Sequence, residues 1–198
     1  MSILIINCNH WIGFHIVNKM LDTDYIVEGI IDKNTSDDLA MFFARNSSFS
    51  FVEEGNKKEY EVCIMIGDYK NAEKIRAKRK FVINPNNGVD RGDVIKIQAP
   101  MLFGEWMPMN KDGIFYKDKF VAFESKEFNN EAVYINIFMS ALLQWIRSEN
   151  IPKCIVVNPN HDRKEKILEN SVYIRENRPI SKYVRVVQKH YELYKRFY

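Results

Sequence analysis

The chain of 198 residues lacks several features that would assign it to a class at once. Its three cysteines, Cys8, Cys63 and Cys154, form no CxxC pair, which argues against a disulfide framework or a zinc knuckle and favours a reducing, cytoplasmic compartment. No apolar run approaches about 18 residues, and no basic segment precedes the first apolar stretch. We therefore expect neither a transmembrane nor a secreted chain.

The chain also has no large excess of charge of one sign. Lys and Arg number 29 against 26 Asp and Glu, so the net charge is only +3. This excess is too small to indicate a nucleic-acid or membrane partner. Hydrophobic residues make up 46% and charged residues 28% of the chain, which is typical of a folded domain and argues against disorder.

The sequence alternates short apolar runs with segments in which apolar residues recur at helical spacing. This alternation predicts an α/β fold with a parallel sheet. Strands are predicted at 2–6, 25–31, 48–53, 62–66, 81–83, 94–98 and 154–157. Helices are predicted near 12–20, 39–44, 70–79, 132–147 and 181–197, with a polar, aromatic-rich loop or hairpin at 109–120. We see no linker or internal repeat, so a single domain with a small C-terminal lobe fits best.

The junction of the first strand and first helix follows the plan of a dinucleotide-binding unit, with Asp32 after the second strand. Such a unit needs glycines where the backbone approaches the pyrophosphate, together with a free helix N-terminus. Here Asn7 can still adopt the positive φ of the turn, whereas the His10 side chain occupies space that a diphosphate needs. Asp32 would hold an adenosine ribose and favour NAD over NADP, if a dinucleotide binds. The predicted cofactor-binding residues at this junction are Asn7, His10, Trp11, Ile12, Gly13 and Asp32.

Residues 6–17 (INCNHWIGFHIV) resemble the TGxxGxxG segment of extended short-chain dehydrogenases/reductases, with Gly13 matching the third glycine. Residues 94–108 (VIKIQAPMLFGEWMP) resemble a strand and loop in the branch that modifies nucleotide sugars for surface polysaccharide. The positions that keep the spacing there are Pro100, Phe103, Gly104 and Trp106, which the resemblance implies are substrate-binding. Residues 132–143 and 156–158 are similar to two further segments of the family, in the same order.

The resemblance implies a trimmed Rossmann-like sheet with flanking helices, with a nucleotide-binding-type core over 1–98 and a reduced substrate-type lobe over 99–198. It leaves the cofactor open, NAD being the one it suggests. In the family, a Tyr-x-x-x-Lys pair on a long helix performs acid–base chemistry. Only Tyr191 has a lysine four places on, Lys195, and that pair lies too far along the chain. Asn84 stands where the family has a serine and is a further predicted cofactor-binding residue.

The residues between the predicted strands 81–83 and 94–98 are too few for a crossover helix. The sequence is thus similar to an extended short-chain dehydrogenase without its catalytic helix, and we assign no catalytic residue. No metal site is predicted either, since Cys8, His10 and His15 lack a second ligand pair at useful spacing. His161 and Asp162 are interpreted as a solvated turn because no nucleophile accompanies them.

Basic residues gather in two segments, 70–80 and the C-terminal helix, where Lys182, Arg185 and Lys189 alternate with tyrosines. We do not expect nucleic-acid binding, because the net charge is small and no recognition motif is present.

Our leading hypothesis is a degenerate, non-catalytic protein that binds a nucleotide, a nucleotide sugar or a protein partner. One alternative is an active NAD-dependent nucleotide-sugar epimerase or reductase in surface polysaccharide biosynthesis, with Tyr116 or Tyr134 as a substitute acid. The other is a purely structural, dimerising interaction protein.

Overall fold

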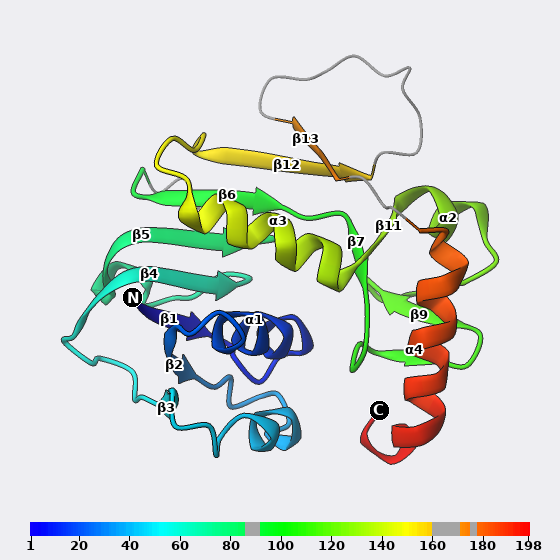
Figure 1. The fold of residues 1–198 in the computed structure, drawn as a ribbon, viewed down its shortest axis with the longest axis horizontal. Coiled ribbons are helices and arrows are strands. Elements are labelled where there is room, and N and C mark those ends of the chain that lie inside the picture. Colours follow the sequence, from blue (N-terminus) through cyan, green and yellow to red (C-terminus); the bar gives the residue numbers. More distant parts are fainter. Residues whose placement is uncertain (86–91, 160–170, 175–177) are drawn as a thin grey trace. The chain divides into compact units, whose positions relative to one another are not determined.

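The computed structural model describes residues 1–85, 92–159, 171–174 and 178–198. The chain forms two compact units, residues 1–98 with 148–155 and residues 99–147 with 156–198. A parallel eight-stranded sheet has the order β13-β12-β6-β5-β4-β1-β2-β3 (Figure 1). Its strands are β1 (Ser2–Ile6), β2 (Ile26–Ile30), β3 (Phe49–Phe51), β4 (Glu59–Ile66), β5 (Arg76–Ile83), β6 (Val94–Gln98), β12 (Cys154–Pro159) and β13 (Ser171–Ile174). The order 3-2-1-4-5-6 is that of a doubly wound dinucleotide-binding fold, so the predicted Rossmann-like class is confirmed.

Helix α1 (Trp11–Leu21) joins β1 to β2 and packs against both strands. Its buried residues recur at three- and four-residue spacing, which forms one apolar stripe along the helix. They are Ile12, Gly13, Ile16, Val17 and Met20. The predicted first helix is therefore present, and it places its N-terminus beside the carboxyl end of β1.

On the opposite face of the sheet, the described connections are short and contain no α-helix. The register aligns Glu28, Leu4, Cys63, Lys80 and Val94 across five strands, and two of these five residues are charged. The connection from β4 to β5 contains only the 3₁₀ turn η2 (Ala72–Lys74), and ten residues join β5 to β6. In a doubly wound fold both faces normally carry helices. We call this side the loop-covered face.

The buried charges on the loop-covered face are paired. Lys80 Nζ lies 2.8 Å from Asp93 Oδ2, and Lys80 is 8% exposed. The Glu28 carboxylate accepts hydrogen bonds from Lys58 Nζ and from Tyr60 Oη, each at 2.5 Å. Such pairing offsets the cost of removing charge from water.

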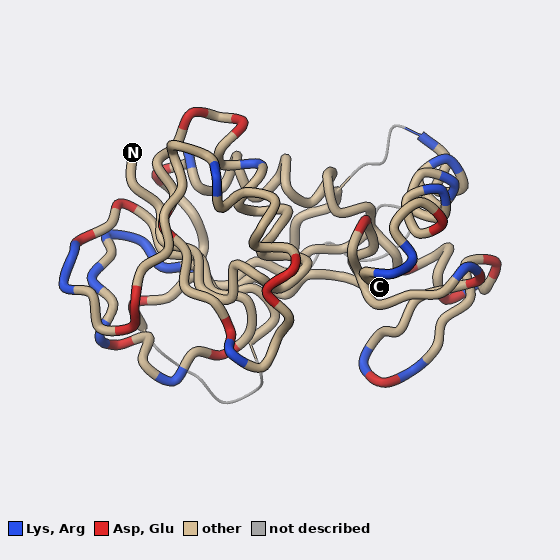
Figure 2. Tube along the Cα trace, turned by 90° about the horizontal axis from the view of Figure 1, so that it is seen from below, with Lys and Arg blue, Asp and Glu red and all other residues tan. Residues whose placement is uncertain are grey.

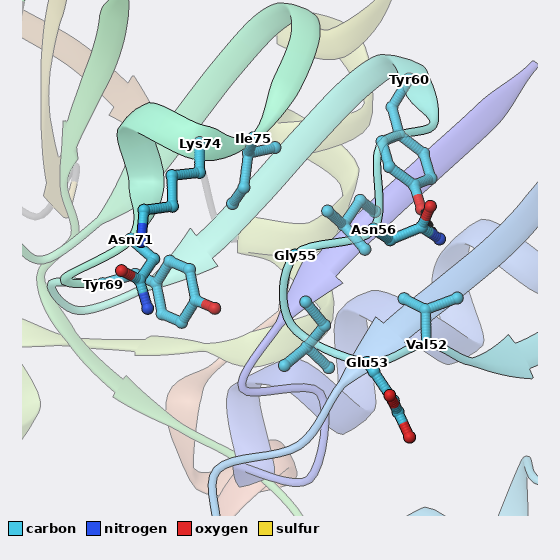
Figure 3. Close-up of a pocket in the computed structure, with 11 residues that line it drawn as sticks. Val52, Glu53, Gly55, Asn56, Tyr60, Tyr69, Asn71, Lys74 and Ile75 are labelled. Carbon is cyan, nitrogen blue, oxygen red and sulfur yellow. Dashed lines mark hydrogen bonds between the residues drawn. The ribbon is translucent and has the colours of Figure 1, made fainter.

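Two cavities lie on the loop-covered face. The smaller, about 20 Å³, lies between the Val52–Asn56 loop and the Tyr69–Ile75 connection (Figure 3), which is room for about one water molecule. The larger, about 200 Å³, has an apolar floor that includes Met65, Val82 and Val94. Both lie against the side of the sheet that lacks α-helices in the described connections.

The predicted helix over 70–79 is wrong. Residues 76–80 belong to β5, where burial alternates between exposed and half-buried positions before the strand enters the core. The basic side chains there lie along a strand rather than on a helical surface, and this alternation has the period of two that a strand requires. The segment predicted as a helix over 39–44 is the 3₁₀ turn η1 (Asp38–Phe42).

The second unit contains the remaining elements. Strand β7 (Met101–Phe103) pairs in parallel with β11 (Ala132–Tyr134), and β8 (Met109–Asn110), β9 (Gly113–Tyr116) and β10 (Lys119–Ala122) form antiparallel hairpins. Lys117 and Asp118 both have positive φ, as a two-residue type I′ hairpin requires. Its helices are α2 (Lys126–Glu131), α3 (Ile135–Arg147) and α4 (Ile180–Tyr194), which the 3₁₀ turn η3 (Lys195–Phe197) follows. The helix predicted over 132–147 thus begins only at 135, after a short strand.

Across the described ranges, no helix is both long and apolar enough to cross a bilayer.

Candidate nucleotide site

The carboxyl ends of β1 and β2 and the N-terminus of α1 form the place where a doubly wound fold binds a dinucleotide. Asn7 begins the turn with φ 60°, and its Nδ2 donates a hydrogen bond to the carbonyl of Ile66 at 2.9 Å. Asn7 therefore makes the turn that a glycine makes in a dinucleotide-binding loop, and its side chain ties that turn to the neighbouring strand.

Gly13 is required by packing alone. A Cβ atom at this position would lie 2.3 Å from the Asn7 carbonyl oxygen and 2.9 Å from Cys8 Cα. Both are backbone atoms, which cannot rotate away as the end of a side chain can. The third glycine of the motif thus lets α1 approach the first strand closely, a role that needs no ligand.

His10 caps the helix that would otherwise face a phosphate. Its Nδ1 accepts a hydrogen bond from the Ile12 N–H at 3.2 Å, and it has the extended backbone of an N-cap. Burial lowers the pKa of the imidazole, and the nearby Asp32 carboxylate only partly opposes this effect. At neutral pH the ring is therefore uncharged, so it offers no charge to a diphosphate and fills one N–H position at the helix end.

Asn9 closes the space between the first turn and the end of β2, a role that the sequence analysis missed. The residue is 1% exposed. Its Oδ1 accepts from the Asp32 N–H at 2.8 Å, and its Nδ2 lies 2.9 Å from the Asp32 carbonyl oxygen and 3.1 Å from that of Thr35. In the sequence, Asn9 is only an amide between the predicted site residues Asn7 and His10, and nothing there marks it as buried.

Asp32 is engaged by its own loop. Oδ1 accepts from the backbone N–H and the side-chain amide of Asn34 at 3.0 and 3.1 Å, and Oδ2 accepts from Thr35 Oγ1 at 3.1 Å. Both carboxylate oxygens thus already accept hydrogen bonds where a ribose hydroxyl would donate. The acid predicted from the sequence lies at the expected place with its hydrogen-bonding capacity partly used.

The other predicted residues of this site lie in two places, Trp11 and Ile12 at the start of α1 and Asn84 at the end of β5. Ile12 is buried in the core, while Trp11 is half-buried with its ring 6.1 Å from that of His10 and 6.2 Å from that of His15. Asn84 is exposed at the end of β5 with φ 50°, and its N–H donates to the Ile97 carbonyl at 2.8 Å. Trp11 therefore joins the His10 side of the site, whereas Asn84 ends a different strand.

The predicted substrate residues lie in the second unit and serve its packing. Phe103 is fully buried, with its ring 5.0 Å from that of Phe128, and the Gly104 N–H donates to Met107 Sδ at 3.3 Å. Pro100 is half-buried ahead of β7.

Trp106 lies in an aromatic cluster formed with the C-terminal segment. It has φ 68°, and its N–H donates to Tyr198 Oη at 2.9 Å. The ring is stacked with that of Tyr198 at 5.7 Å and meets the ring of His190 edge-on at 4.3 Å. The tail residues thus hold the loop that the resemblance assigned to substrate.

Tyr134, one of the substitute acids considered, is 6% exposed and donates to Glu105 Oε1 at 2.8 Å. Burial, reinforced by the Glu105 carboxylate, raises its pKa, so the phenol gives up its proton less readily than an ordinary tyrosine and is a weaker acid. Tyr116, the other, lies on β9 with the Lys117 ammonium 5.2 Å from its ring centre. The Tyr191 ring packs 5.0 Å from that of Tyr198, while Lys195 is exposed in η3.

Among the residues that the structure describes, no group of three His, Cys, Asp or Glu could hold a metal ion. The predicted turn at His161 and Asp162 lies outside the described residues.

No protein-family model matches the sequence, and no curated protein matches it. Solved structures do match the fold. dTDP-glucose 4,6-dehydratase from Bacillus anthracis str. Ames, in complex with NAD, has a TM-score of 0.67 at 9% identity over 100% of this chain and 98% of that chain. UDP-glucuronic acid 4-epimerase from Bacillus cereus, also with NAD, has a TM-score of 0.60 at 12% identity over 98% of both chains. Yeast methylglyoxal/isovaleraldehyde reductase Gre2, with NADPH, has a TM-score of 0.54 at 14% identity over 80% of this chain and 75% of that chain.

These similarities establish the fold. The chain has the Rossmann-like fold of the extended short-chain dehydrogenases/reductases, the group to which the nucleotide-sugar dehydratases and epimerases belong. The fold implied by the sequence resemblance is thereby confirmed.

Proposed function

We propose that this chain is a non-catalytic derivative of the extended short-chain dehydrogenase fold, which takes no nicotinamide dinucleotide and acts as a binding protein. The observation that carries the proposal is the network of Asn9, His10 and Asp32. A dinucleotide needs the N–H groups at the start of α1 and a carboxylate after β2. Here the His10 side chain caps the N-terminus of α1, and Asn9 fills the space between the first turn and the end of β2. Residues of its own loop hydrogen-bond the Asp32 carboxylate.

A second observation supports the absence of catalysis. The family's chemistry uses a tyrosine whose pKa is lowered by a lysine on one long helix. The ten residues between β5 and β6 leave no room for such a helix. Tyr134, a buried tyrosine of the second unit, has its pKa raised instead, first by burial and then by the Glu105 carboxylate.

The decisive assay is turnover by the purified chain. UDP-glucose, dTDP-glucose and UDP-glucuronic acid are each incubated with the protein and NAD⁺, and products are separated by chromatography. We expect no epimerised, dehydrated or reduced sugar at protein concentrations of tens of micromolar. Product formation that is lost in an Asp32→Ala variant would overturn the proposal and establish the enzyme alternative.

The similarity to a dTDP-glucose dehydratase and a UDP-glucuronic acid epimerase favours one specific ligand class for a binding protein, a nucleotide sugar. Isothermal titration with the same three compounds, without a dinucleotide, tests it. Saturable binding without turnover would establish a nucleotide-sugar-binding protein. Absence of binding by all three would direct the search to a protein partner.

A further inference from the structure

Helix α4 has two distinct sides. Its inner side includes Val184 and Val187, which are buried, and Tyr183, whose ring stacks on that of Tyr134 at 4.5 Å. Positions three and four residues apart on the other side are exposed and remain so into η3. We call these exposed residues the outer stripe of α4; they are Lys182, Arg185, Val186, Lys189, Glu192, Leu193, Arg196 and Phe197.

The outer stripe combines cations with large apolar side chains. Residues 178–198 hold six Lys and Arg and a single acid, Glu192, and Figure 2 shows the basic positions along the helix that leads to the C-terminus. Leu193 is 69% exposed, Val186 48% and Phe197 40%. The salt bridges Glu28–Lys58, Glu61–Lys78 and Lys80–Asp93 lie in the first unit, and cations outnumber acids six to one among residues 178–198.

The chemistry of the stripe selects among anionic partners. Aliphatic Val186 and Leu193 neither stack on bases nor donate hydrogen bonds, so a nucleic-acid strand would gain little from their exposure. An acidic peptide would need a groove, whereas an exposed helix side is convex. An anionic bilayer surface uses both features, because lipid headgroups attract Lys and Arg while the interface buries Leu, Val and Phe.

We propose that the outer stripe of α4 docks this protein on the surface of a bilayer that contains anionic phospholipid. The helix lies along the interface, with Leu193 and Phe197 entering the headgroup region and Arg185 and Lys189 near the phosphates. The net charge of +3 is small because acids elsewhere in the chain balance this local concentration of cations. The proposal goes beyond the proposed function and holds whether or not a nucleotide binds.

Vesicle sedimentation of the full chain tests the proposal. The vesicles are equal mixtures of phosphatidylglycerol and phosphatidylcholine, compared with phosphatidylcholine alone, at about 0.1 M and 1 M salt. We expect binding to the anionic vesicles only, with a large loss at high salt, where the screening length falls from about 10 Å to about 3 Å. No binding above that to the neutral vesicles would overturn the proposal.

Two variants and a control locate the contact. Arg185→Glu with Lys189→Glu is expected to lower the partition coefficient by about 25-fold or more, since each cation near such a surface contributes about fivefold. Leu193→Ser is expected to lower it by about tenfold through lost apolar burial. The control, Lys57→Glu with Arg76→Glu, makes the same change in net charge at exposed positions of the first unit and is expected to bind like the wild type.

The remaining outcomes also decide the question. Equal loss in the control variant would show non-specific charge attraction and refute the assignment to α4. Tight binding of a single-stranded oligonucleotide that Leu193→Ser leaves unchanged, together with weak vesicle binding, would assign the stripe to nucleic acid instead. Circular dichroism of each variant confirms that the chain is folded before binding is compared.

Discussion

Replacing Asn9 with alanine tests whether the nucleotide site is filled by the chain's own side chains. The change removes one acceptor bond to the Asp32 N–H at 2.8 Å and donor bonds to two carbonyl oxygens at 2.9 and 3.1 Å. Each such bond contributes about 1 kcal/mol, and a buried group left without a partner costs about 1–3 kcal/mol more. We therefore expect Asn9→Ala to lower the free energy of unfolding by about 3 kcal/mol, a large part of the 5–15 kcal/mol typical of a domain.

Urea unfolding followed by circular dichroism measures this effect. The matched control is Asn46→Ala, which removes an exposed turn bond to the Ser48 N–H and should change stability by about 0.5 kcal/mol. Asn9→Asp keeps the acceptor but places a carboxylate oxygen beside carbonyl oxygens, so it should destabilise more than alanine at pH 7. A loss below about 1 kcal/mol for Asn9→Ala would refute the reasoning, because a site open to a ligand would not depend on this amide.

Three further predictions concern the same unit. Gly13→Ala gains about 1 kcal/mol of helix propensity but forces a Cβ to 2.3 Å from the Asn7 carbonyl oxygen, so urea unfolding should show a net loss of stability of about 2 kcal/mol. The control, Gly92→Ala, has open space around the new Cβ and should leave stability unchanged. Because the folded pKa of His10 lies below 6.5, the wild type should lose stability relative to His10→Asn as the pH falls from 7.5 to 5.0, and parallel urea midpoints would contradict this. Asp93→Ala leaves the buried Lys80 ammonium without its carboxylate and should lower the thermal midpoint more than Lys80→Met does; the reverse order would contradict the pairing.

Much of the first unit could be predicted from the sequence because its strands are short apolar runs and α1 has a regular apolar stripe. The register of a parallel sheet brings Asn7, His10 and Asp32 to one edge, so their placement followed from strand ends alone. Asn9 was missed because an amide between two predicted site residues looks like a loop residue until its burial is known. Its importance depends on contacts 23 to 27 residues away in the chain.

The error at 70–79 has a physical reason. Six basic residues lie between 70 and 80, and closely spaced Lys and Arg are equally compatible with an exposed helix and with the outer end of a strand. Strand β5 pairs with β4 from Arg76 onward, and the buried Lys80 is paired there with Asp93. Such tertiary pairing overrides local propensity, so the absence of a helix between β4 and β5 was not predicted, whereas the connection from β5 to β6 was correctly judged too short for one.

Isothermal titration of NAD⁺ into the purified wild-type chain tests the central claim most directly. If Asn9, His10 and the loop of Asp32 fill the site, the titration gives no saturable heat up to millimolar dinucleotide. A dissociation constant in the micromolar range, weakened at least tenfold by Asp32→Ala, would contradict the account and return the protein to the enzymes whose fold it shares.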